Sequence, residues 1–155
     1  MKLVLDTNVW LDCLIFADPR VDALRTALAQ GSLTVLATQA MLDEFADVIG
    51  RPQFGIDPQA RARLAARQLE QVSLCSAAPD CRLNCTDRAD QMFIDLAVAQ
   101  RVEWLVSRDK ALLRLRKTAA RRFSIRIGTP EEWITAAQSE LNHPPIIDDR
   151  FEANP

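Results

Sequence analysis

The segment MKLVLDTNVW, residues 1–10, decides how the rest of this 155-residue sequence is interpreted. Residues 2–5 are rich in apolar side chains, as in strands that are buried on both faces of a parallel sheet. The run ends at Asp6, and a carboxylate is costly to bury without a partner. No helical repeat is evident after Asp6. The segment therefore predicts a strand that delivers an acid to the edge of a sheet.

Apolar runs and helical patterns alternate along the rest of the chain. Further strands are expected at 33–37, 72–75, 102–106 and 124–127. Helices are expected at about 19–30, 39–49, 58–70, 88–101, 110–120 and from 130 onward, several of them opened by a capping residue followed by proline. In the helix at 58–70 we expect Leu64 and Leu69 to face inward. Strands that alternate with helices predict an α/β fold with a parallel sheet covered on both faces.

The length and the 48% hydrophobic content fit one globular domain. We expect this domain to span residues 1–138. The proline-containing segment 139–155 is expected to be a C-terminal tail.

Neither a signal peptide nor an apolar run of the ~20 residues needed to cross a membrane is evident. A cytoplasmic protein without membrane contact is therefore expected, and its four cysteines should stay reduced.

Acidic residues fall where the carboxyl ends of the expected strands meet. Asp6 ends the first strand, and Asp109 follows the fourth. Glu44 lies early in the helix after the second strand, and Asp87 and Asp90 lie in the first turn of the helix before the fourth. Ligands of parallel sheets bind at this edge. Clustered carboxylates repel one another unless a cation lies between them, and hard oxygen ligands without histidine favour Mg²⁺ or Mn²⁺.

Each of these acids also has a simpler explanation. Acids near helix starts stabilise helices as caps and dipole partners by a few tenths to about 1 kcal/mol each. Asp6 is the exception, and the joint pattern over four segments favours a metal site. Asn8 and Ser107 lie close to Asp6 and Asp109 in sequence, so they are expected to orient these carboxylates.

Charge is unevenly distributed along the chain. Residues 1–50 contain three basic and seven acidic side chains, whereas residues 101–126 contain nine basic and two acidic ones. Four of the basic residues are spaced as one stripe of the helix expected after the fourth strand: Lys110, Arg114, Lys117 and Arg121. Such a concentration of positive charge is a hint of a polyanionic partner, although a solvated helix face would give the same pattern.

Three stretches resemble the PIN-domain proteins: LVLDTNVWL near the amino end, LDEFADVIGRPQF in the first third, and DRADQMFIDLAVAQRVEWLVSRDKALL in the second half. The similarity spans about residues 1–136 and lies closest to the toxin branch of bacterial toxin–antitoxin pairs. It implies a three-layer α/β/α sandwich with a five-stranded parallel sheet. It also implies a VapC-like, metal-dependent ribonuclease with an RNA substrate and a cognate antitoxin. Under this resemblance we expect the basic stripe to bind RNA phosphates, although a solvated helix face that contacts an acidic antitoxin segment would give the same pattern. Dimers are common in that family, so a homodimer is a further expectation.

The resemblance assigns metal-binding and catalytic roles to Asp6, Glu44 and Asp109. Many relatives carry a further acid 18 residues before the last one, where this chain has Gln91. The adjacent Asp90 is the expected replacement, with Asp87 as the second choice. A shift of one residue turns a side chain by about 100° around a helix, so the choice matters.

Two other functions remain open from the sequence. The first is a catalytically impaired PIN-fold module that binds RNA or an antitoxin without turnover. The second is a phosphatase with Asp6 as nucleophile, although the usual second acid two residues on is here Asn8.

Overall fold

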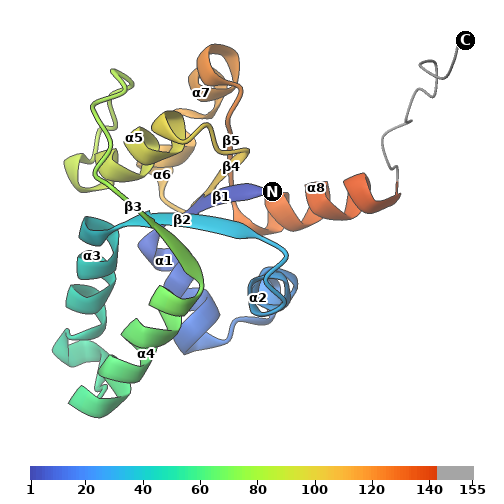
Figure 1. The fold of residues 1–155 in the computed structure, drawn as a ribbon. Coiled ribbons are helices and arrows are strands. Elements are labelled where there is room, and N and C mark those ends of the chain that lie inside the picture. The colour runs from blue at the N-terminus through green and yellow to red at the C-terminus, as the bar shows by residue number, and fades with distance from the viewer. Residues whose placement is uncertain (143–155) are drawn as a thin grey trace, which may run out of the picture.

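Five parallel strands form one sheet in the computed structural model, which describes residues 1–142 (Figure 1). The strands are β1 (Lys2–Leu5), β2 (Thr34–Thr38), β3 (Val72–Cys75), β4 (Trp104–Val106) and β5 (Arg126–Gly128). Their order across the sheet is β3-β2-β1-β4-β5, and every neighbouring pair is parallel. The predicted α/β fold with a five-stranded parallel sheet is confirmed.

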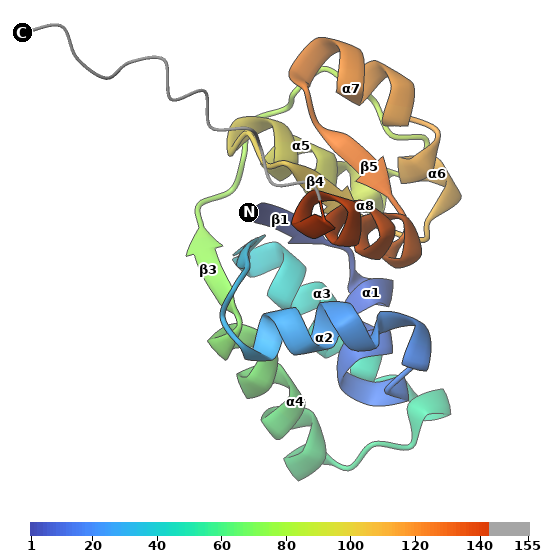
Figure 2. The same ribbon diagram turned by 90° about the vertical axis from the view of Figure 1, so that its right-hand side faces the viewer.

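Helices cover both faces of the sheet (Figures 1 and 2). One layer contains α1 (Thr7–Leu11), α2 (Asp22–Ala29), α3 (Gln39–Ile49), α4 (Pro58–Glu70) and α8 (Pro130–Asn142). The other contains α5 (Gln91–Ala99), α6 (Lys110–Leu113) and α7 (Arg116–Phe123). Short turns complete the order: a π-helical turn η1 (Asp12–Phe16) and 3₁₀ turns η2 (Pro19–Val21), η3 (Pro52–Phe54) and η4 (Arg88–Asp90).

Successive residues of β1 belong to different cores, because side chains alternate between the two faces of a strand. Leu3 and Leu5 pack with the α1, α2, α3 and α8 layer, whereas Val4 packs with the α5, α6 and α7 layer. All three tryptophans are buried, Trp10, Trp104 and Trp133 alike, and all lie in the first core. Their indole rings are therefore core groups rather than exposed surfaces for stacking.

The order of the strands reverses between β1 and β4. The chain runs from β1 through β2 to β3 on one side, and then returns to place β4 and β5 on the other. Parallel α/β sheets bind ligands outside the carboxyl ends of the strands at such a switch point. Asp6 follows β1 directly, and residues 107–109 follow β4, so both segments lie at this position.

The helix after Asp6 is the main element that the sequence pattern did not predict. Thr7, Val9, Trp10 and Leu11 are all buried, so α1 has almost no polar face. Amphipathic periodicity marks a helix only when one side meets water. Asp6 therefore caps a helix whose repeat the sequence pattern did not show.

Other expected elements differ in detail. The helix expected at 110–120 is broken into α6 and α7 where the Leu115 N–H bonds to the Leu112 carbonyl in a tight turn. The expected inward position of Leu69 is wrong, because it is 51% exposed while Gln68 is 2% exposed. Gln68 follows Leu64 by four residues and so shares its helix face, whereas Leu69 does not.

The last helix, α8, begins after Thr129 as expected and reaches Asn142. Residues 139–142 of the expected tail are therefore helical, and the remainder, 143–155, lies outside the described residues. None of the helices described between residues 1 and 142 combines the length and the apolar composition that crossing a membrane requires.

Candidate metal centre

Asp6 is a buried carboxylate with two sets of partners. Its Oδ1 accepts the N–H of Val9 at 3.0 Å as the N-cap of α1, and its Oδ2 accepts a hydrogen bond from the Ser107 hydroxyl. Its backbone N–H donates to the Val106 carbonyl at 3.1 Å, which ties the end of β1 to the end of β4. Asp6 is therefore fixed by a residue about a hundred positions further along the chain.

The charge on Asp6 is nevertheless disfavoured. Burial raises the pKa of its carboxyl group to about 6, against the opposing effect of the hydrogen bonds from Ser107 and Val9, and the charge of Asp109 adds to the rise. Two donors thus compensate only partly for the loss of water around this carboxylate.

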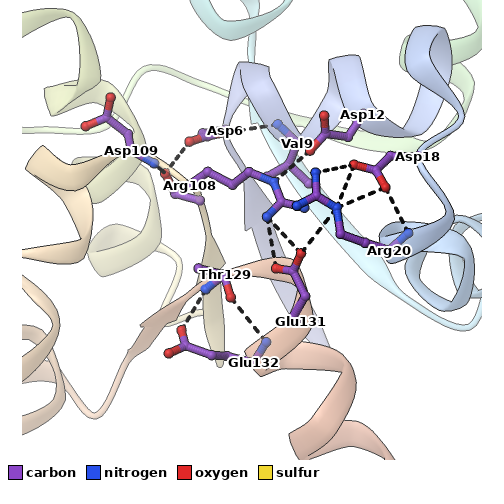
Figure 3. A network of polar contacts seen from close by, with 11 residues as sticks. Asp6, Val9, Asp12, Asp18, Arg20, Arg108, Asp109, Thr129, Glu131 and Glu132 are labelled. Atoms are coloured by element: carbon purple, nitrogen blue, oxygen red, sulfur yellow. Dashed lines mark hydrogen bonds and ion pairs between the residues drawn. The ribbon is translucent and has the colours of Figure 1, made fainter.

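Ser107 links Asp6 to Asp109. The Ser107 side chain is fully buried, and its Oγ donates to Asp6 and accepts the N–H of Asp109 at 2.9 Å. Asp109 itself caps α6, because its Oδ1 accepts the N–H of Ala111 at 2.7 Å. Asp6 and Asp109 lie near each other in Figure 3. Ser107 therefore joins the Asp6 carboxylate to the backbone of Asp109 at the switch point.

Asp90, the last residue of η4, completes a cluster of three acids. Burial raises the pKa of its carboxyl group to about 7, and the charges of Asp109, Asp87 and Asp6 act in the same direction. Its Oδ2 is buried and receives no hydrogen bond in the described part of the chain. The carboxyl groups of Asp90 and Asp109 lie within hydrogen-bonding range, so they can share a hydrogen bond only while one of them is protonated. We define Asp6, Asp90 and Asp109 as the acid cluster.

Asp87 has a different environment from Asp90. Its side chain is exposed and caps η4, with Oδ1 accepting the N–H of Ala89 at 2.9 Å. Of the two candidates for the third acid, Asp90 is the one with a buried oxygen that lacks a donor.

Gln91 points away from the acid cluster. Its side-chain oxygen accepts the N–H of Cys85 at 2.8 Å, and its side-chain nitrogen donates to the Leu83 carbonyl at 3.0 Å and to Asp95 at 2.9 Å. The Gln91 side chain therefore fastens the loop before α5 to the outer face of that helix. It replaces none of the acids at the switch point.

Glu44 reaches the site through Thr7. The Thr7 hydroxyl donates to the Glu44 carboxylate, which joins α3 to the residue directly after Asp6. The sequence pattern did not single out Thr7, although its position next to Asp6 was a usable signal. Asn8 is exposed, and no hydrogen bond joins its side chain to Asp6 in the described residues. Ser107 and the Val9 N–H make the contacts expected of Asn8.

In the described residues, the carboxylate oxygens of the acid cluster do not all lie within 4.8 Å of one another. Within the described residues, just one group of three or more potential ligands has all its atoms within 4.8 Å of one another, and it consists of Asp80, Cys81 and Asp95. That group lies outside the acid cluster.

Arg108, between Ser107 and Asp109, anchors their loop from the opposite side. Its Nε contacts Asp12 at 2.8 Å and its Nη1 contacts Glu131 at 2.9 Å, so one side chain joins η1, α8 and the loop after β4 (Figure 3). Arg20, which pairs with Asp18 at 2.7 Å, approaches the same Glu131 carboxylate at 4.0 Å. These half-buried ion pairs limit the movement of residues 107–109.

The expected basic stripe lies over two helices. All four of its residues are exposed; Lys110 lies in α6, Arg114 in the turn after it, and Lys117 and Arg121 in α7. None of the ion pairs found in the described residues uses these four side chains, whereas the neighbouring Arg116 and Arg126 pair with Glu132 and Glu140. The four charges remain available to solvent or to a polyanion.

Comparisons with known proteins place the chain in a family. A model of the PIN domain matches residues 2–111. A search of curated proteins finds no match. Among solved structures, a chain of VapBC2 from Rickettsia felis, bound to a DNA fragment from their promoter, is similar in fold, with a TM-score of 0.58 and 13% sequence identity. The similarity covers 82% of this chain and 97% of that one. The chain belongs to the PIN domain family.

Proposed function

We propose that this protein is an endoribonuclease that requires Mg²⁺ or Mn²⁺ and acts as the toxin of a toxin–antitoxin pair. One observation carries the proposal: Asp90 has a buried carboxylate oxygen without a donor, next to Asp109 and Asp6. An uncompensated carboxylate cluster destabilises a fold, so a cation that binds there accounts for its presence. Membership of the PIN domain family supports the same conclusion.

The donor set fits a hard divalent cation. Asp6, Glu44, Asp90 and Asp109 would hold it, and all four offer carboxylate oxygens. When bound, such an ion lowers the pKa of water and neutralises charge on a phosphodiester. Ser107 keeps Asp6 and Asp109 in place, and Thr7 does the same for Glu44. At neutral pH without a cation, Asp90 is expected to hold a proton for part of the time.

The basic stripe gives RNA a route to these acids. Lys110 follows Asp109 directly, and Arg114, Lys117 and Arg121 continue the positive surface over α7. Contacts to phosphates make binding depend on salt with a slope of about −0.7 per phosphate for single strands. If Lys110, Arg114 and Lys117 all become Ala, we expect the slope to weaken by about 2. A slope equal to that of the wild type would remove this surface from the proposal.

An antitoxin partner follows from the same reasoning. The structurally similar VapBC2 is a complex that was solved with a piece of its own promoter DNA. We propose a protein partner of this kind for the present chain, together with a cytoplasmic location and a homodimer.

The alternative, a PIN-fold module without turnover, rested on Gln91. The Gln91 side chain is hydrogen-bonded to the loop before α5 and to Asp95, and in this proposal Asp90 supplies the acid beside it. A phosphatase that uses Asp6 as nucleophile would need a second acid two residues on, and Asn8 is exposed there.

Cleavage of a mixed RNA pool at increasing Mg²⁺ or Mn²⁺ tests the proposal. We expect cleavage that depends on the metal in the wild type and in Asp47→Asn, an exposed acid of α3, but not in Asp6→Asn. Circular dichroism would confirm that both variants are folded. Metal-independent cleavage, or equal activity in Asp6→Asn, would contradict the proposal. Phosphatase activity without nuclease activity would support the Asp6 nucleophile instead.

A further inference from the structure

A cavity lies near the acid cluster, between α5 and the loop that precedes it. Its volume is about 410 Å³, and its lining is formed by Asp80, Asn84, Cys85, Arg88, Gln91 and Asp95. We call it the loop pocket. Ligand sites for small organic groups begin at roughly 300 Å³, so this space admits a nucleobase with its ribose.

The floor of the loop pocket is rigidly built. Asp95 is nine-tenths buried, and its Oδ1 accepts the N–H of Cys81 at 3.0 Å and the Gln91 amide at 2.9 Å. Gln91 in turn accepts the backbone N–H of Cys85 and donates to the backbone carbonyl of Leu83. Every polar group of the Gln91 side chain is thus committed to the loop. The pocket is preformed, and a ligand would not need to organise it.

The rim, in contrast, carries polar groups without partners. In the described residues, no hydrogen bond or ion pair involves the Asn84 amide or the Arg88 guanidinium. Asp80 uses its Oδ1 to accept the N–H of Arg82 at 2.7 Å, and its Oδ2 is unpaired in the same part of the chain. The rim therefore offers a carboxylate acceptor, an amide and a charged donor to a single ligand.

The chemistry of the loop pocket favours a neutral ligand. Asp80, Cys81 and Asp95 are close enough to hold a cation. However, burial raises the pKa of the Cys81 thiol to about 11, so it stays protonated, and Asp95 Oδ1 already accepts two hydrogen bonds. The carboxylates of Asp80 and Asp95 would repel a phosphate, and Arg88 would repel a cation. A nucleobase, which has both donors and acceptors, meets this combination.

The loop pocket and the acid cluster share a wall at Cys85. The Cys85 side chain lines the pocket, and burial together with the charges of Asp90 and Asp109 raises the pKa of its thiol. Arg88 and Asp90 lie in the same 3₁₀ turn. An RNA chain with a phosphate at the acids would therefore place a neighbouring base at the pocket.

We propose that the loop pocket binds one base of the RNA substrate, next to the phosphate that is cut, and that this base is guanine. Guanine offers the adjacent N1–H and N2–H donors that the Asp80 carboxylate can accept, while its O6 and N7 are the atoms to which arginine commonly donates. The inference rests on the proposed ribonuclease function. It assigns a specificity-determining role to Asp80, Asn84 and Arg88.

Sequencing the ends produced from a randomised RNA pool tests this inference. We expect the wild type to prefer guanine about tenfold at one position near the cut, as one good bidentate contact provides. Asp80→Asn keeps an acceptor for Arg82 but loses the charge, and it should reduce the preference to about twofold, as should Arg88→Met. Arg82→Met, which removes a positive charge from the same loop, should keep the full preference. The inference would be overturned if the wild type showed no base preference near the cut or preferred another base. It would also be overturned if both Asp80→Asn and Arg88→Met kept the full guanine preference.

A binding measurement separates this inference from the proposed function. GMP, AMP, CMP and UMP are titrated into the metal-free protein, and amide resonances are followed by NMR. We expect GMP to shift the signals of residues 80–91 more than the other nucleotides do, and the shift to shrink in Asp80→Asn. Selective GMP binding without RNA cleavage would reject the ribonuclease and retain the pocket. Cleavage without selective GMP binding at these residues would reject the pocket alone.

Discussion

Asp90 and Gln91 are neighbours in the chain, but they belong to two regions with opposite chemistry. On the inner side, at the end of η4, Asp90 joins Asp6 and Asp109, and one of its oxygens is buried without a donor. On the outer side, both polar atoms of Gln91 are hydrogen-bonded to the loop or to Asp95. A region whose polar groups are all paired stabilises the fold. A region with surplus charge is destabilising, and it is retained where a ligand uses it.

The largest expected effect separates Asp90 from its other neighbour, Asp87. Asp90→Asn should reduce metal-dependent cleavage by more than the roughly 10- to 100-fold that supporting residues of metal sites contribute. Asp87→Asn should cost less, because Asp87 is exposed and its cap on η4 can be made by asparagine. The measurement is the cleavage rate at saturating Mg²⁺. An intact Asp90→Asn enzyme beside an inactive Asp87→Asn enzyme would reverse the assignment.

The next effect concerns stability on the outer side of α5. Gln91→Leu removes the partners of the Cys85 N–H and the Leu83 carbonyl, and we expect the free energy of unfolding in urea to fall by about 1–3 kcal/mol. Gln138→Leu on α8 is the matched control; its side chain is exposed, so a change within about 0.5 kcal/mol is expected. Equal stability of the two variants would mean that the loop is not held by Gln91.

The smallest effect is the pH dependence of stability that Asp6 and Asp90 cause on the inner side. The folded pKa values of Asp6 and Asp90, about 6 and about 7, lie above the ordinary value of 3.8. Between pH 4 and 7 the folded protein therefore binds more protons than the unfolded chain, and its stability falls as the pH rises. For the partly exposed Asp90 we expect a loss of about 1 kcal/mol after allowing for solvent screening.

Urea unfolding in EDTA at pH 5 and pH 7 measures this loss. Between pH 5 and pH 7, Asp90→Asn should lose less free energy of unfolding than the wild type, because the contribution of Asp90 is gone. Asp47→Asn should lose as much as the wild type. If Asp90→Asn and the wild type lost the same stability between the two pH values, the raised pKa of Asp90 would be refuted.

Several parts of the structure could be predicted because simple patterns govern them. Parallel strands bring their carboxyl ends to one edge, so Asp6 and Asp109 had to be close once β1 and β4 were adjacent. Ser107 was expected to lie beside these acids, and its hydroxyl donates to the Asp6 carboxylate and accepts the backbone N–H of Asp109. The bounds of β3 and α4 agree with the pattern because Asp57 and Pro58 open the helix and residues 72–75 form a short apolar run.

Other features depend on contacts between distant segments, so no local sequence pattern predicts them. The buried α1 has no polar face, so its helical period was hidden. The bond between Thr7 and Glu44 joins positions 37 residues apart. Gln91 occupies the position where many relatives carry an acid, and the sequence gives only that position. The orientation of its side chain depends on the Leu83 carbonyl and the Cys85 N–H of the folded loop.

The hydrogen bond between Ser107 and Asp6 also constrains when the site can exist. The two residues are 101 positions apart, and β1, the first strand to be synthesised, lies in the middle of the finished sheet. A growing chain emerges from the ribosome with its amino end first. Asp6 must therefore wait without Ser107 and Asp109 until at least a further hundred residues have been made. Any activity that depends on these three residues is absent from the nascent chain and begins only when β4 takes its place beside β1.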